Sequence, residues 1–136
     1  MAIDLWNEDG SFGGIGPEFE PDWLFTDRQK ALQADLIELS RTTLRPNAIE
    51  SDEGYIFPRK NFEALAELGV LSLNVPQSLG GMGENHVATA MVVETIARYG
   101  CPSTAMCFVM HSAAVAAGML RHHDNAAIQD LMTRLD

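Results

Sequence analysis

Basic residues are scarce in this sequence. Its 136 residues include nine Lys and Arg against 19 Asp and Glu, so the formal net charge is -10 and the isoelectric point is near 4.6. A protein this acidic is repelled by phosphate backbones and by anionic lipid headgroups. The charge balance therefore excludes nucleic acid as a partner and argues against binding to an anionic membrane surface.

Cysteine is scarce as well. Cys101 and Cys107 lie six positions apart in one apolar helical pattern, so their side chains point about 120° apart around the helix axis and cannot pair within it. No CxxC spacing is present. We expect two small buried thiols in a reducing cytoplasm. The first residues lack a basic segment followed by an apolar one, which also predicts a cytoplasmic protein.

The histidines do not predict a metal site, because no two of them stand three or four positions apart on one helical face. His111 is expected to be a core histidine that bonds a neighbouring carbonyl. His122-His123 is expected to mark a helix C-terminus, where cations are favourable. The four histidines are His86, His111, His122 and His123.

Composition divides the chain into two parts. Hydrophobic residues make up 46% of it and charged residues 21%, which is typical of one globular domain with a buried core. The first 23 residues differ, because they hold six acids, no Lys or Arg, and a Gly-rich run. Such a composition resists regular structure. We therefore expect an acidic, Gly-rich N-terminal tail over residues 1–23 and one domain over residues 24–136.

Capping residues and apolar spacing predict two helices at the start of the domain. Thr26 and Gln29 have the spacing of a capping box, and leucines then recur at offsets of 0, 4 and 7, so a helix is predicted over residues 27–43. Pro46 ends it. A second helix is predicted from Phe57-Pro58, with a proline in its first turn and Gly69 as a left-handed cap.

The next stretch is expected to lack helix. Leu71, Leu73 and Val75 alternate along the chain, which predicts one short extended segment from Val70 to Pro76. Residues 80–83, Gly-Gly-Met-Gly, then predict a Gly-rich loop, and glycine there lets two backbone segments pass closely.

Three further helices are predicted in the second half. Asn85 is expected to cap a helix that ends at Tyr99, and Ser103 to cap one that reaches about residue 120. The latter has only five positions that are neither strongly apolar nor alanine. Its alanines, central histidine and Gly118 lower its hydrophobicity too far for a membrane span, so we interpret it as the central buried helix.

Asp124 is expected to cap the last helix, which is still continuing at Asp136. Its inward-facing residues are predicted to be Ile128, Leu131, Met132 and Leu135. The predicted fold is therefore all-α, a bundle of about five helices with one short extended segment and a Gly-rich loop.

Three passages carry a resemblance to a known family. The stretch from Phe62 to Glu84, FEALAELGVLSLNVPQSLGGMGE, is followed by VETIAR at 93–98 and by STA at 103–105. In order and spacing they resemble the helix, glycine turn, "EELAR" and "STA" passages of the N-terminal helical domain of acyl-CoA dehydrogenases. The resemblance covers about residues 24–136, and residues 1–23 fall outside it.

The resemblance implies that the complete protein removes hydrogen across the Cα–Cβ bond of an acyl-CoA thioester with FAD, and that this domain supplies part of the acyl-chain cleft. By position, the lining residues would be Ala105, Met106, Val109 and Ala113. In the family, FAD is bound mainly by a following β-domain, and the base comes from a later helical domain. We therefore assign no catalytic residue in this chain, which is expected to be inactive alone.

Two alternative functions remain open. A flavin monooxygenase of the same architecture would place an aromatic or other small substrate in the same apolar cleft. A non-catalytic helical adaptor would instead use the apolar helix to bind a partner. For the dehydrogenase, the resemblance implies an acyl-CoA or similar small substrate, an electron acceptor, and a homo-oligomer assembled chiefly through parts outside this chain.

Overall fold

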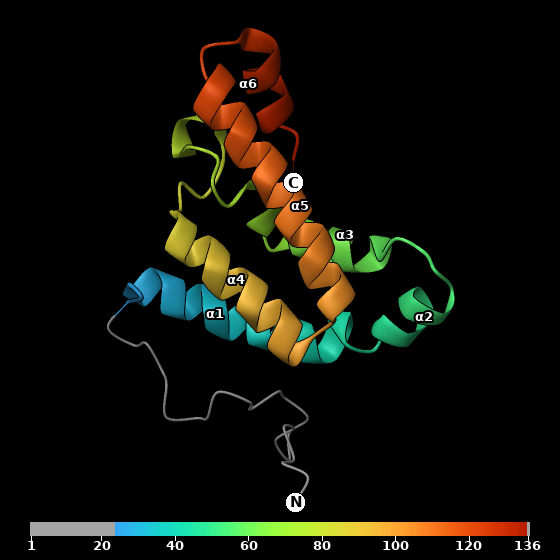
Figure 1. The fold of residues 1–136 in the computed structure, drawn as a ribbon. Coiled ribbons are helices and arrows are strands. Elements are labelled where there is room, and N and C mark those ends of the chain that lie inside the picture. The colour runs from blue at the N-terminus through green and yellow to red at the C-terminus, as the bar shows by residue number, and fades with distance from the viewer. Residues whose placement is uncertain (1–23, 136) are drawn as a thin grey trace, which may run out of the picture.

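The computed structural model describes residues 24–135, and the predicted tail over residues 1–23 lies outside the described residues. Within residues 24–135 all regular structure is helical and no strand occurs, which confirms the all-α class. Figure 1 shows α1 and α4 side by side, and α5 running from the end of α4 to α6 at the opposite end of the fold. The elements are α1 (Asp27–Leu39), η1 (Ser40–Leu44), α2 (Ala48–Glu53), α3 (Arg59–Glu67), η2 (Val70–Ser72), η3 (Gln77–Leu79), α4 (His86–Tyr99), α5 (Pro102–His122) and α6 (Ala126–Met132).

The first helix begins where its capping box predicts. The Thr26 hydroxyl accepts a hydrogen bond from the backbone N–H of Gln29, and the Gln29 side chain accepts one from the backbone of Thr26. After α1 the chain widens into the π-helical turn η1, which ends at Leu44, one residue beyond the predicted helix. This turn packs closely against Gly100, where an added Cβ would lie 3.2 Å from the Cβ atoms of Ser40 and Leu44.

The short helix α2 is one that the sequence pattern did not predict. The first helix does end before Pro46, but α2 forms directly after it. Among its six residues only Ser51 is buried, and Ile49 is exposed. No apolar stripe therefore marks this helix in the sequence.

The extended segment predicted from Val70 to Pro76 is wrong. Gly69 does adopt the left-handed conformation after α3, with a φ of 79°. Beyond it the chain turns as the 3-10 helix η2 instead of extending. A single strand here would have no neighbour for its backbone N–H and C=O groups. The turn instead buries four consecutive side chains: Val70, Leu71, Ser72 and Leu73.

The start of α5 also differs from the prediction. Asn85 caps α4 as expected, since its side chain accepts a hydrogen bond from a backbone N–H in the first turn. The cap of α5, however, is Cys101 and not Ser103. Pro102 occupies the first helical position, where its missing N–H leaves no hydrogen bond unmade.

The last helix is shorter than predicted. Asn125, not Asp124, caps α6 by accepting hydrogen bonds from two backbone N–H groups. The helix ends at Met132 instead of continuing to the end of the chain. Met132 is buried as expected, but Leu131 is exposed, because α6 packs against α5 through one face only.

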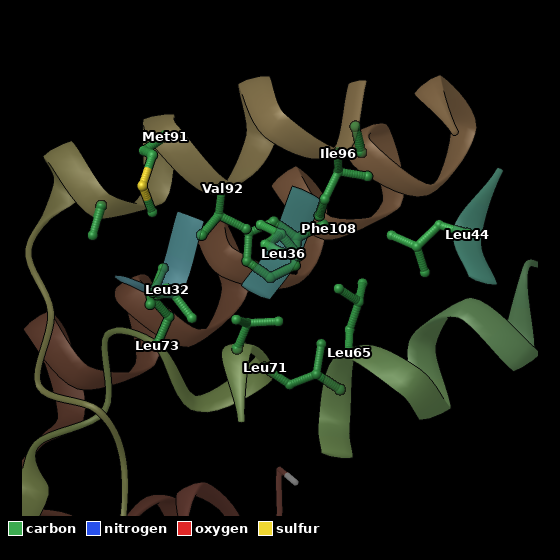
Figure 2. Packing of buried hydrophobic residues seen from close by; sticks show 13 residues of the cluster. Leu32, Leu36, Leu44, Leu65, Leu71, Leu73, Met91, Val92, Ile96 and Phe108 are labelled. Carbon is green, nitrogen blue, oxygen red and sulfur yellow. The ribbon is translucent and has the colours of Figure 1, made fainter. Parts of the chain in front are cut away.

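The main core lies where α1, α3, α4 and α5 meet. Figure 2 shows Leu36, Val92 and Phe108 close together near its centre, contributed by α1, α4 and α5. All three side chains are fully buried. A second, smaller cluster joins Val75 to Val115 of α5 and Met132 of α6. The two clusters together hold one side of α5 along its length.

The expectation that α5 is a fully enclosed central helix is wrong. Residues 24–135 supply neighbours on one side of it, from α2, α4, α6 and η2, and its other side stays open. Its buried side chains include Thr104, Phe108, Ser112 and Val115. Although α5 has 21 residues, neither it nor any other helix within residues 24–135 is long and apolar enough to cross a membrane.

Candidate functional site

An apolar face of α5 is open to solvent. Met106 is 64% exposed, Val109 is 38% exposed and Met110 is 68% exposed, and Ala113 and Ala117 are exposed as well. Counted from Met106, these residues stand at offsets of 3, 4, 7 and 11, which a helix places in one narrow stripe. We call the five residues Met106, Val109, Met110, Ala113 and Ala117 the α5 stripe. It is the candidate functional surface of this domain.

Three of the four residues predicted to line a cleft lie on the α5 stripe, and one does not. Met106, Val109 and Ala113 share the open face, whereas Ala105 is 4% exposed and packs into the main core. The sequence pattern did not identify Met110 and Ala117. Their spacing from Met106 could have done so, but in a helix that is apolar on every side no single stripe stands out.

Polar contacts fix which face of α5 turns outward. The Thr104 hydroxyl accepts a 2.8 Å hydrogen bond from Asn61 Nδ2, which also donates to the Leu44 carbonyl at 3.1 Å. Seven residues later, and so on the same side of the helix, His111 Nε2 lies 2.7 Å from the Leu71 carbonyl oxygen. The predicted carbonyl bond of His111 is thus confirmed. Because α5 is anchored at both positions, it cannot rotate about its axis without breaking these two hydrogen bonds.

The Gly-rich loop packs beside the second half of α5. Gly80 and Gly83 have φ angles of 90° and 68°, in the left-handed region that favours glycine. A Cβ on Gly81 would lie 2.3 Å from the Val75 carbonyl oxygen, so no other residue fits there. The close approach places Val75 in contact with the cluster around Val115 of α5.

The first turn of α1 holds this loop. Arg28 donates a 2.9 Å hydrogen bond to the Met82 carbonyl, and its Nε pairs with one carboxylate oxygen of Glu84 at 3.3 Å. Gln29 donates to the other oxygen of Glu84 at 2.9 Å. Glu84 therefore serves to join the loop to α1, and we assign it no catalytic role.

Three further carboxylates lie on α3 and α4, and one of them, Glu63, lines a hollow between α2 and α3. Glu94 pairs with Arg98 at 3.3 Å, while Glu63 and Glu67 are exposed on α3. Within residues 24–135 no group of three or more His, Cys, Asp or Glu side chains could hold a metal ion. The chemistry-bearing side chains of this domain are therefore dispersed.

Both cysteines are free, and Cys101 is buried at the start of α5. Burial raises the pKa of the Cys101 thiol, but hydrogen bonds from the side chains and backbone N–H groups of Ser103 and Thr104 outweigh it and hold the pKa below its ordinary value. The sulfur lies 2.9 Å from the Ser103 hydroxyl oxygen. Since Cys101 is on the buried side of α5, it is not part of the α5 stripe.

A hollow beside α2 and α3 is a separate feature. Its lining mixes apolar side chains such as Ile56 and Phe57 with charged ones, and an ion pair of 3.0 Å joins Lys60 to Glu50 beside it. No residue of α5 lines it. The hollow is therefore not a continuation of the α5 stripe.

Comparison with known proteins identifies the domain. A sequence model described as "Acyl-CoA dehydrogenase, N-terminal domain" matches residues 26–135. A cyclohex-1-ene-1-carbonyl-CoA dehydrogenase of Syntrophus aciditrophicus is 39% identical over 95 residues, which cover 70% of this chain and 22% of that protein. A benzylmalonyl-CoA dehydrogenase of Aromatoleum aromaticum is 35% identical over 91 residues, 67% of this chain and 24% of that protein. A short-chain specific acyl-CoA dehydrogenase of Rattus norvegicus is 27% identical over 96 residues, 71% of this chain and 23% of that protein.

No solved structure matches the chain significantly. The matched region covers less than a quarter of the length of each of these three relatives. Within this chain, however, the family match extends over almost every residue that the structure describes. The chain therefore belongs to the acyl-CoA dehydrogenase family, and its residues 26–135 are that family's N-terminal domain.

Proposed function

We propose that the complete protein is a flavin-dependent acyl-CoA dehydrogenase that oxidises the Cα–Cβ bond of an acyl-CoA thioester. The observation that carries this proposal is the family match over residues 26–135. We also propose that the complete protein passes its electrons to a separate electron acceptor and that it assembles into a homo-oligomer. The catalytic base is supplied by another part of the protein, because Glu63 and Glu67 are exposed and Glu84 and Glu94 are held in ion pairs.

The role proposed for this domain is to form one wall of the acyl-chain cleft through the α5 stripe. The stripe is apolar throughout, and its first half is bulky whereas its second half consists of alanine. An apolar wall binds an acyl chain by removing hydrocarbon surface from water. Met106, Val109 and Ala113 would contact the chain directly. Ala105 would not contact the acyl chain but would position α5, because its small side chain lets the helix pack close to the main core.

The Gly-rich loop has no free backbone N–H groups at residues 81–83 with which to bind a flavin phosphate. Bound phosphate groups usually meet free backbone N–H groups in a glycine-rich loop. Here the N–H groups of Gly81, Met82 and Gly83 all donate to carbonyl groups within residues 72–76. We therefore propose that FAD is held mainly outside residues 24–135, and we derive no reaction step at the flavin from this domain.

Flavin reduction tests the activity. The chain is mixed anaerobically with FAD and a saturated acyl-CoA, alone and then with the downstream domains present on the same polypeptide. We expect bleaching of the yellow flavin absorbance only with the longer protein. Bleaching by the short chain would contradict the assignment of the base and flavin to other parts. No bleaching by the longer protein would contradict the dehydrogenase proposal and favour the adaptor.

Substitution of Ala113 tests the cleft wall. In the complete protein, Ala113→Phe places a large side chain in the middle of the stripe and should lower kcat/KM for long acyl chains much more than for short ones. The matched control is Ala114→Phe, which adds the same bulk at a neighbouring exposed alanine outside the stripe. Equal losses for long and short substrates with Ala113→Phe would show that Ala113 packs against other side chains of the protein and not against the acyl chain.

A further inference from the structure

Three buried polar atoms at the contact between η1 and α4 lack a partner. They are the hydroxyl oxygens of Ser40 and Thr95 and the Nε of Arg98, none of which makes a hydrogen bond to another described residue. Ser40 and Thr95 are both 0% exposed. A buried polar group without a hydrogen bond is costly, so each such atom in a folded protein needs an explanation. We call Ser40, Thr95 and Arg98 the inner polar cluster.

The packing of α1 on α4 brings Ser40 to the last turns of α4. The two helices run side by side in the same direction (Figure 1), and the first turn of α1 bonds Glu84 just before α4. Leu36 and Val92 lie together in the core further along (Figure 2). One turn beyond Leu36, Ser40 packs on the end of α4, where an added Cβ on Gly100 would lie 3.2 Å from the Ser40 Cβ.

Thr95 and Arg98 lie on those same turns of α4. They stand three positions apart, so the helix places them on one face. This face is turned toward η1, because the ring of Tyr99, one turn after Thr95, has the guanidinium carbon of Arg41 at 4.9 Å from its centroid. Arg41 directly follows Ser40 in the chain. The three members of the inner polar cluster thus converge where η1 contacts α4.

We propose that the inner polar cluster binds one internal water molecule, which bridges η1 and α4. The Nε–H of Arg98 donates to the water oxygen, and the water donates its two hydrogens to the hydroxyl oxygens of Ser40 and Thr95. Three hydrogen bonds are what a buried water typically makes. Because the site spans two elements, the water acts as a structural link between them. The proposal does not depend on the proposed enzyme activity.

The chemistry of the site favours water over a small anion. Glu94 pairs with a terminal nitrogen of the Arg98 guanidinium group at 3.3 Å, so the charge of that group is already balanced. An anion would also lose its hydration on entering the core, at a large cost. The two hydroxyl groups can each accept a hydrogen bond from water. Neither of them bonds the carbonyl one turn earlier in its own helix, which is a common local partner of a helical Ser or Thr.

Removal of the hydroxyls tests the bridge. In the full chain, Thr95→Val and Ser40→Ala each delete one hydroxyl with little change in shape. Each variant should lower the urea midpoint of unfolding by about 0.5 M, because the remaining polar atoms lose their shared partner. The double variant should lower it by clearly less than the sum, since both changes release the same water. Removing a hydroxyl that is merely unpaired would instead leave the midpoint unchanged or raise it.

The matched control is Thr42→Val, which makes the same substitution at an exposed threonine of η1. Combined with Ser40→Ala, it should give additive shifts of the urea midpoint. Oxygen-17 magnetic relaxation dispersion counts long-lived internal waters directly. The natural chain should hold one more such water than Thr95→Val, and Thr42→Val should match the natural chain. This count decides the matter if the double variant is too unstable for a urea titration.

Any of four results would overturn the proposal. The first is a urea midpoint of Thr95→Val that stays unchanged or rises. The second is a double variant whose loss equals the sum, because Ser40 and Thr95 would then share no partner. The third is an equal count of long-lived waters in Thr95→Val and the natural chain. The fourth is a loss seen in sodium chloride but not in sodium acetate of the same ionic strength, since a chloride ion would then occupy the site.

Discussion

Asn61 donates a 2.8 Å hydrogen bond to the hydroxyl of Thr104, although the two residues are 43 positions apart. Both side chains are fully buried, and the same Nδ2 also reaches the Leu44 carbonyl at the end of η1. The Asn61 carbonyl oxygen accepts a third bond, from the side chain of Asn47, at 2.9 Å. One amide side chain thus ties η1 and the loop before α2 to α5, and it helps to set the outward face of α5.

Asn61→Ala should lower the free energy of unfolding by about 2–4 kcal/mol, because it leaves the Leu44 carbonyl and the Thr104 hydroxyl buried without this partner. Urea unfolding followed by circular dichroism measures the loss. Asn47→Ala, the control, removes only the bond from a half-buried residue and should cost about 1 kcal/mol. Similar losses for both variants would show that the buried bonds of Asn61 add little.

Gly81→Ala and Gly118→Ala should have opposite effects on thermal stability. The new Cβ at residue 81 meets the backbone oxygen of Val75 at 2.3 Å, which only a backbone shift can relieve, so the melting temperature should fall. At residue 118, inside α5, the new Cβ meets the flexible end of Met132 at 3.0 Å. There alanine should stabilise the helix by up to about 1 kcal/mol. An unchanged melting temperature of Gly81→Ala would show that the backbone of the loop can shift away from Val75 at little cost.

Phe108→Ala and Met106→Ala separate the two faces of α5. Phe108 is 0% exposed at the centre of the main core, so its truncation should cost about 3–5 kcal/mol of unfolding free energy. Met106 is on the α5 stripe, and its truncation should change the stability of this chain by about 0.5 kcal/mol or less. The same urea titration checks both values. A large loss with Met106→Ala would show that the stripe is covered in solution.

The Cys101 thiol should make stability depend on pH in alkaline solution. Its pKa in the folded chain lies below the ordinary value of 9.0, so the unfolded chain binds more protons between the two pKa values. The stabilisation is absent at lower pH, grows as the pH rises through the folded pKa, and is complete above 9.0. Unfolding free energies of the natural chain and of Cys101→Ser should therefore diverge as the pH approaches 9.0. Ser103→Ala removes one of the hydrogen bonds that stabilise the Cys101 thiolate, so it should reduce this difference in unfolding free energy. An unchanged difference would contradict the assignment of the lowered pKa to these hydrogen bonds.

Local sequence signals were sufficient for several elements of the fold. Thr26 with Gln29, Asn85 and Gly69 each act on their own backbone neighbours, so capping and left-handed geometry follow from a few adjacent residues. The carbonyl bond of His111 was also predicted, because a histidine in an apolar helix needs a polar partner. Which carbonyl it finds, that of Leu71, depends on how α5 packs on η2.

Other features depend on contacts between distant segments. The alternation of Leu71, Leu73 and Val75 fits a strand as well as it fits a turn that buries consecutive side chains, and only the absence of a partner strand among the described residues decides between them. The helix α2 has no apolar stripe, so its sequence gives no amphipathic signal.

The amino-acid sequence by itself determined that this protein is helical, where α1 and α4 begin, and which family it resembles, because those properties reside in neighbouring residues and in motif order. It could not determine which side of α5 is open. A helix that is apolar all round carries no internal preference, and the choice is made by the hydrogen bonds of Thr104 and His111 and by the packing of Phe108. Only the tertiary structure therefore separates Ala105, inside the core, from Met106, on the exposed stripe.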